Sequence, residues 1–166
     1  MEQKQTHVMY GLLSGIGMAV IGLILYVAGM AFKTGAQYLE YLPFLVFTIL
    51  NAMAFSKAND GNVTFGNVFW SGFKLAMVAA IIIVVWALAS SFIFPDMKEK
   101  VIDMMREKMA KQPNMTDDIM EKSVEMTRKW WNIMAVAGGI FGTLFYGAIF
   151  SLIGGAVAKK NAVRRM

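Results

Sequence analysis

The stretch LAMVAAIIIVVWALASSFIF occupies residues 75–94 and contains twenty positions without a charged side chain. An α-helix rises about 1.5 Å per residue, so this stretch reaches about 30 Å, the thickness of the hydrocarbon core of a bilayer. It therefore predicts a transmembrane helix, which we place at about residues 69–94.

Three other apolar runs lie on either side of this one, at about residues 8–30, 39–55 and 133–158. The first is much longer than the apolar segment of a signal peptide, so we expect a retained span. The run 39–55 is short and contains Pro43 and Asn51. A re-entrant loop is the alternative there, but only a complete helix satisfies its own backbone hydrogen bonds in lipid.

The composition agrees with a membrane protein. Of the 166 residues, 57% are hydrophobic and 16% are charged, whereas soluble domains carry about 25% charged residues. We predict an all-α integral membrane protein with four transmembrane helices in a single membrane domain, residues 1–166. The net charge of +5 reflects basic membrane flanks rather than nucleic-acid binding.

Four spans place both ends of the chain on one side of the bilayer. Lys159, Lys160, Arg164 and Arg165 directly follow the last apolar run, as is typical of a cytoplasmic edge. The segment 95–129 carries eight bases, which alone would favour the opposite orientation, but eight acids match them. We predict cytoplasmic termini with segment 95–129 outside.

Segment 95–129 is predicted to be an amphipathic helical hairpin outside the membrane. Pro95 is suited to the start of a helix, and the sequence Gln112-Pro113-Asn114 breaks it. Thr116 is a good N-cap for a second helix. Neither helix is long enough to be stable alone in water, so their apolar faces need each other, the membrane surface or a partner.

Seven of the 15 methionines lie in this hairpin. Packing between the two helices explains them, but a methionine-rich face also binds varied partners, and thioethers bind cuprous copper. Without cysteine and with a single histidine, His7, we predict no metal site and no cofactor. The residues proposed for partner binding are Met97, Val101, Met104, Met105, Met109, Ile119 and Met120.

Small residues recur at intervals of four in the first and fourth spans. Such stripes allow helices to approach closely, either within one chain or between chains. The residues predicted to pack in this way are Gly11, Gly15, Gly138, Gly142, Gly147, Ser151 and Gly155.

The apolar runs hold no deeply placed charge, because Glu40 and Lys74 lie at the edges of their spans. A proton-coupled transporter normally needs one. No phosphate-binding loop, zinc motif or nucleophile elbow is present, so we predict no catalytic residues. Asn51 is the most polar residue within a span and the first one to test.

The loop GNVTFGNVFWSGFK at residues 61–74, the stretch FPDM at 94–97 and the acidic helix start after Met115-Thr116 resemble a family of small four-span bacterial membrane proteins. The family is catalogued as a domain of unknown function (number 4199). The likeness runs from Tyr10 to about Lys160. It implies four spans and a bacterial cytoplasmic membrane, and no activity. In the motif we expect Thr64 to cap a helix and Gly66 to permit a turn.

Three functions are compatible with these features. The leading hypothesis is a non-enzymatic accessory or scaffold subunit of a membrane complex, with the hairpin as its docking element for a protein partner. The alternative is a small homo-oligomeric transporter or channel, because four spans alone enclose little space. A third is a membrane enzyme acting on lipid through Glu40 or the hairpin acids, although catalysis needs convergent groups.

Overall fold

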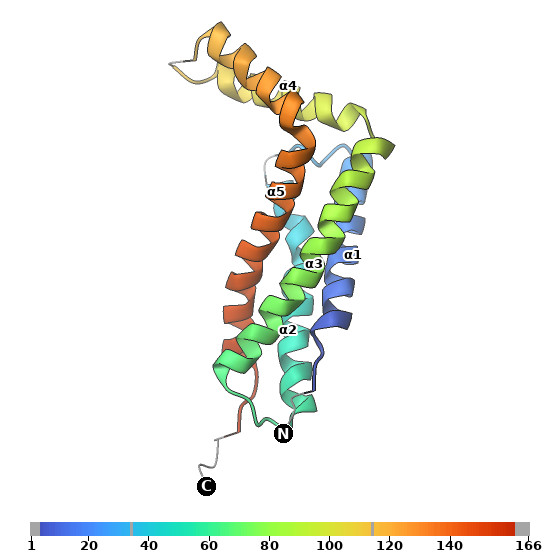
Figure 1. Cartoon of the computed structure of the whole chain (residues 1–166), viewed down its shortest axis with the longest axis vertical. Coiled ribbons are helices and arrows are strands. Elements are labelled where there is room, and N and C mark those ends of the chain that lie inside the picture. Colours follow the sequence, from blue (N-terminus) through green and yellow to red (C-terminus); the bar gives the residue numbers. More distant parts are fainter. Residues whose placement is uncertain (1–3, 34, 114, 162–166) are drawn as a thin grey trace. The chain divides into compact units, whose positions relative to one another are not determined.

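The computed structural model describes residues 4–33, 35–113 and 115–161, and their regular structure is entirely helical (Figure 1). Arg164, Arg165 and Asn114, which were used in the sequence analysis, lie outside these residues. The elements in chain order are α1 (His7–Val27), the 3₁₀-helix η1 (Ala36–Glu40), α2 (Tyr41–Ala58), α3 (Phe65–Ile93), α4 (Asp96–Ala110) and α5 (Asp117–Val157).

Four segments within the described residues are long and apolar enough to cross a membrane. They are His7–Val27, Tyr38–Ala58, Phe65–Ile93 and Asp117–Val157. The second begins with the 3₁₀ turn η1, and Pro43 is the third residue of α2, where its missing N–H costs little. The apolar run at residues 39–55 was therefore shorter than the helix that contains it.

The fourth segment differs from the expectation. We predicted a hairpin ending at residue 129 and a separate span at 133–158, but α5 is one helix of 41 residues. Nothing between Lys129 and Gly138 breaks a helix, since Trp130 and Trp131 are both compatible with helical backbone. The change from polar to apolar sequence therefore marks no end of secondary structure.

The chain forms two compact units. Of the described residues, the first unit contains those up to Ile83 and those from Ile140 to Asn161, and the second contains those from Val84 to Gly139. We call them the bundle unit and the hairpin unit. The bundle unit is built from α1, α2, the first part of α3 and the last part of α5.

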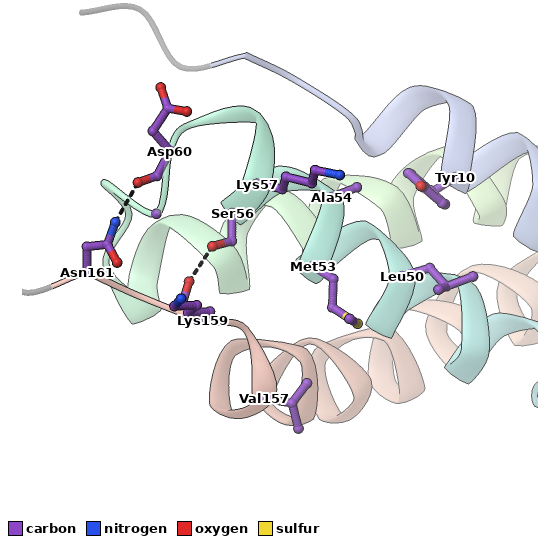
Figure 2. Close-up of a pocket in the computed structure, with 11 residues that line it drawn as sticks. Tyr10, Leu50, Met53, Ala54, Ser56, Lys57, Asp60, Val157, Lys159 and Asn161 are labelled. Atoms are coloured by element: carbon purple, nitrogen blue, oxygen red, sulfur yellow. Dashed lines mark hydrogen bonds between the residues drawn. The ribbon is translucent and has the colours of Figure 1, made fainter.

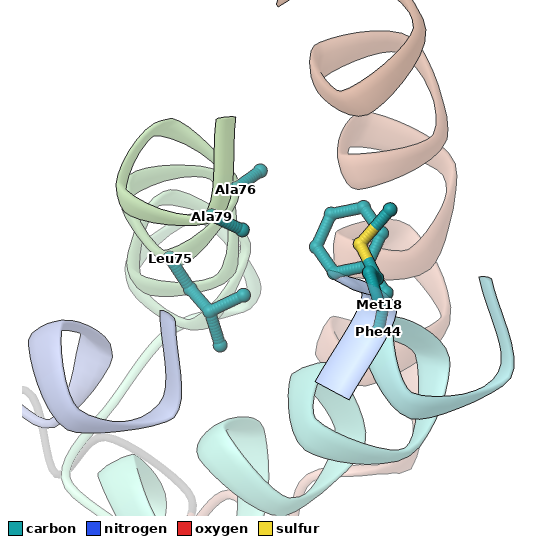
Figure 3. Close-up of a cluster of buried hydrophobic side chains, with 5 residues drawn as sticks. All are labelled: Met18, Phe44, Leu75, Ala76 and Ala79. Atoms are coloured by element: carbon teal, nitrogen blue, oxygen red, sulfur yellow. The ribbon is translucent and has the colours of Figure 1, made fainter. Parts of the chain in front are cut away.

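The core of the bundle unit surrounds the Phe44 ring with buried aliphatic side chains. Met18, Phe44, Leu75, Ala76 and Ala79 are almost fully buried and pack together (Figure 3). The two alanines leave room on α3 for the Phe44 ring of α2. Close packing of this kind is the main source of helix association when lipid surrounds the helices.

The predicted packing residues of the bundle unit lie against neighbouring helices of the same chain. A Cβ atom placed on Gly11 would be 2.6 Å from the Val78 Cβ, and one on Gly147 would be 2.3 Å from the Ala76 Cβ. Helix α3 thus contacts both α1 and α5 closely. The same applies to Gly15 with Ile82, Gly155 with Phe65 and Ser151 with Gly72, while Gly142 makes only an ordinary contact with Tyr41 and Gly138 has open space around it.

Asn51 is fully buried, and three segments meet at its side chain. Its Oδ1 accepts a hydrogen bond from the Thr6 hydroxyl at 2.6 Å, and its Nδ2 donates one to the Ser71 hydroxyl at 3.1 Å. The amide therefore links the start of α1 to α2 and α3. In a dry interior such a satisfied polar group joins helices rather than lining a pathway.

The turn between α2 and α3 contains two residues with positive φ, Asp60 at 55° and Gly61 at 73°. Thr64 caps α3 as predicted: its hydroxyl accepts the Asn67 N–H at 3.2 Å, while the Asn67 Oδ1 accepts the Thr64 N–H at 2.9 Å. This is a reciprocal capping box. The expectation for Gly66 was wrong, since it lies in the first turn of α3 and Gly61 provides the turn instead.

Candidate interaction surface

The hairpin unit begins with a well-defined helix start and a sharp break. Helix α4 has Pro95 at its N-cap position and two acids, Asp96 and Glu99, in its first turn, where a negative charge is stabilised by the helix dipole. After the break, the Thr116 hydroxyl accepts the Ile119 N–H at 3.4 Å and caps α5. Local sequence signals thus fix both helix starts.

Two ion pairs join α4 to the first turns of α5. Arg128 lies 2.6 Å from Glu99, and Arg106 lies 3.4 Å from Glu121. The Lys98 Nζ also donates to the Arg128 carbonyl at 3.2 Å. Early residues of α4 therefore meet late residues of this part of α5, so the two helices run antiparallel.

The interior of the hairpin centres on one pair of side chains, of which Ile102 was missed in the sequence. Ile102 of α4 and Val124 of α5 are the fully buried apolar residues here, and the ion pairs place them opposite each other. Ile102, Met105 and Met109 share a helix face by their spacing of three and four. That spacing was the available signal, but the predicted face ran through Met97, Val101 and Met104 as well and left out Ile102.

The residues proposed for partner binding divide into two groups. Ile119 is 50% exposed, whereas the others are partly buried. The Met105 sulfur, for example, accepts a hydrogen bond from the Thr127 hydroxyl at 3.6 Å. The partly buried residues are Met97, Val101, Met104, Met105, Met109 and Met120.

A different apolar surface is exposed on α5. Ile119, Met126, Trp130 and Ile133 are 50%, 63%, 45% and 59% exposed. Their spacings of seven, four and three place them on one face of the helix. We call this set the α5 stripe. Met126 was missed in the sequence because it lies outside the apolar face that was expected to pack inward.

A groove of about 500 Å³ lies where α3, α4 and α5 contribute to the hairpin unit. Its lining includes Lys98, Arg128 and Lys129 and no acid. Each base is already engaged, Lys98 by a carbonyl and Arg128 by Glu99. The Lys129 Nζ lies 5.7 Å from the centre of the Trp130 ring. The bases therefore stabilise the hairpin itself.

Acids of the hairpin are also paired at its surface. Asp96 lies 2.7 Å from Lys100, and Glu107 lies 2.9 Å from Lys111. The hydrogen bond and charge of Lys111 lower the pKa of the Glu107 carboxyl below its usual value. Such pairs keep a carboxylate ionised and bound to its neighbour, which does not favour acid–base catalysis.

Outside the hairpin, Glu40 stands apart from other acids. Its carboxylate lies against Gly22 of α1, about 3.3 Å from where a Cβ would be. The described residues hold no cluster of three or more His, Cys, Asp or Glu side chains that could hold a metal ion.

No curated protein and no solved structure matches the chain significantly. One family does: the sequence model described as "Protein of unknown function (DUF4199)" matches residues 9–160, which is nearly the whole chain. The match includes the loop before α3, the α3–α4 corner and the start of α5, which carried the resemblance in the sequence. The chain therefore belongs to this family of unknown function.

Proposed function

We propose that the chain is a multi-pass protein of the bacterial cytoplasmic membrane. The segments before α1 and after α5 would then lie in the cytoplasm and the hairpin outside. Support comes from the four long apolar helices and from Lys159 and Lys160 after the last of them. A reporter enzyme that works only in the cytoplasm should be active when it is fused after α5, and a reporter that works only outside the cytoplasm should be inactive there. The opposite pair of results would reverse the orientation.

Within that membrane we propose a non-enzymatic role as an accessory or scaffold subunit, with residues 95–129 as the docking element. The observation that carries this proposal is the α5 stripe, an exposed apolar face that begins on this hairpin with Ile119 and Met126 and continues directly beyond it with Trp130 and Ile133. The polar groups of the hairpin already bind each other. Contiguous apolar surface of this kind is typical of protein contacts. Interface hot spots are enriched in tryptophan, and Trp130 would be the natural anchor.

The test compares two positions on α5 by site-specific photo-crosslinking in native membranes. A photoreactive residue at Met126, in the stripe, should give a discrete adduct with one partner. The same residue at Glu125, which is exposed one position away, should give little or none. The substitution Ile119→Gln together with Trp130→Gln should reduce the Met126 adduct at least tenfold. If the chain purifies alone in mild detergent and Met126 forms no adduct, the docking role is refuted.

The alternative function is a homo-oligomeric transporter or channel. An Asn51 side chain accessible to water would favour this function, but in the bundle unit that side chain is buried and hydrogen-bonded at both ends. The measurement that separates the two functions is the native mass in mild detergent. A defined homo-oligomer would favour a transporter or channel, and a complex with a different chain would favour the scaffold role.

A further inference from the structure

The bundle unit has a cavity of about 650 Å³ at the end where α2 stops and α5 stops (Figure 2). Its lining combines two kinds of side chain. Leu50, Met53 and Val157 are apolar and exposed, while Lys57 and Lys159 are charged. Tyr10 of α1 completes one side.

Hydrogen bonds to main-chain carbonyls hold the walls of this cavity in place. The Ser56 hydroxyl of α2 donates to the carbonyl of Lys159, just beyond α5. Two residues later, the Asn161 Nδ2 donates to the Asp60 carbonyl at 2.7 Å and the Asn161 N–H donates to the Gly61 carbonyl at 2.9 Å. Both lysines therefore project from backbone that is joined across the junction of α2 and α5.

Beneath the junction is a small buried core. It contains Ala52, Phe55, Val63, Val68 and Ala158, all at most 4% exposed. A packed floor and bonded walls mean that the cavity exists before any ligand binds. Preorganisation of this kind lowers the entropic cost of binding.

The two lysines are free to bind an anion. Among the described residues neither has an ion-pair partner, in contrast to Lys160, whose ammonium group donates to the carbonyls of Gly155 and Ala158. Asp60 is the acid in the lining. Figure 2 shows its carboxylate directed away from Lys159 and from the apolar wall, and it forms no ion pair with either lysine among the described residues.

We propose that this cavity binds an anionic glycerophospholipid, with the phosphate at the basic end that carries Lys57 and Lys159 and an acyl chain along Leu50, Met53 and Val157. A lipid fits because the apolar wall belongs to helices apolar enough to lie in a membrane and continues directly into the basic end. Basic pockets between helices at the cytoplasmic side are recognised lipid-headgroup sites. With the proposed orientation, the lipid belongs to the cytoplasmic leaflet. The site is independent of the hairpin.

The test measures lipid affinity of the full chain in detergent by native mass spectrometry. Phosphatidylglycerol should bind more tightly than phosphatidylcholine with the same acyl chains. The double variant Lys57→Gln/Lys159→Gln should bind phosphatidylglycerol about thirtyfold more weakly, since each lysine near a membrane phosphate contributes about a fivefold factor. Lys57→Arg/Lys159→Arg should keep most of the affinity.

A matched control has the same change in net charge at other exposed lysines, Lys33→Gln/Lys122→Gln, and should bind as the natural chain does. Equal affinity for the two lipids, or an unchanged affinity in the Lys57/Lys159 variant, overturns the proposal. Glycerol 3-phosphate at millimolar concentration should not displace the lipid. Complete displacement would assign the cavity to a soluble phosphate ester and would also overturn it.

Discussion

The substitution Gly147→Ala tests the tightest helix contact of the bundle unit. A Cβ on Gly147 would lie 2.3 Å from the Cβ of Ala76 and 3.1 Å from the Cζ of Phe44, whereas ordinary contact begins at 3.4 Å. The Ala76 Cβ is fixed to its backbone and has no rotamer to change. Helices α3 and α5 must therefore move apart by more than an ångström to accept a single methyl group.

The expected free-energy change follows from two opposing effects. Replacing glycine by alanine in a helix stabilises the helix by up to about 1 kcal/mol. Overpacking costs about 1–3 kcal/mol, and the rigid neighbour places this site at the upper end. The net result should be a loss of about 2 kcal/mol in the free energy of unfolding. Gly138 lies on the same helix with nothing within 4 Å of its Cβ position, so Gly138→Ala should be neutral or stabilise by up to about 1 kcal/mol.

The assay is reversible unfolding in mixed micelles, followed by helical circular dichroism, for the natural chain and both variants. The two alanine variants should differ by about 3 kcal/mol, because they share the helix-propensity gain and differ only in the clash. If Gly147→Ala unfolds with the same free energy as Gly138→Ala, the close contact of α5 with α3 does not exist as described, and the packing argument fails.

Three further predictions concern other parts of the molecule. Asn51→Ala should destabilise the chain by about 1–2 kcal/mol in the same assay, because two interhelical hydrogen bonds are lost at about 0.6 kcal/mol each and a small void remains; an unchanged stability would show that the bonds contribute nothing. Ile102→Ala should lower the stability of the hairpin by about 2–5 kcal/mol and should raise amide hydrogen exchange only in α4 and the first turns of α5. An equal rise in exchange throughout the chain would contradict a hairpin that unfolds separately from the bundle unit. The Glu107 carboxyl should titrate below its usual pKa in an NMR experiment, and Lys111→Ala should return it to the usual value. Because this pKa is lowered in the folded chain, the Glu107–Lys111 pair stabilises the last turns of α4 at pH values above the ordinary pKa of glutamate. The stabilisation is lost as the pH falls through the lowered pKa. Lys111→Ala should remove this pH dependence.

Local features of the sequence were enough to predict much of the fold. Length and hydropathy identified four helices able to cross a membrane, since a span needs a nearly continuous apolar run. Thr64 and Thr116 marked helix starts because N-caps depend on the nearest few residues. The family resemblance rested on the same local motifs, and the family match bears it out.

The tertiary structure alone decided which faces pack and which remain exposed. The stripes containing Gly11 and Gly147 predicted close contacts, but only packing identified α3 as the neighbour of both. Asn51 stood out in the sequence as the most polar residue within a span, but only the folded chain shows that its partners are the Thr6 and Ser71 hydroxyls.

The hairpin and the lysine cavity illustrate the same division. The apolar face predicted for α4 left out Ile102, and burial in the folded hairpin shows that Ile102 faces inward. The cavity of Lys57 and Lys159 exists only because segments distant in sequence are brought together. Helix formation and membrane span length depend on neighbouring residues, so the sequence by itself determined them. Burial and binding surfaces depend on which helices meet, and only the folded chain decides that.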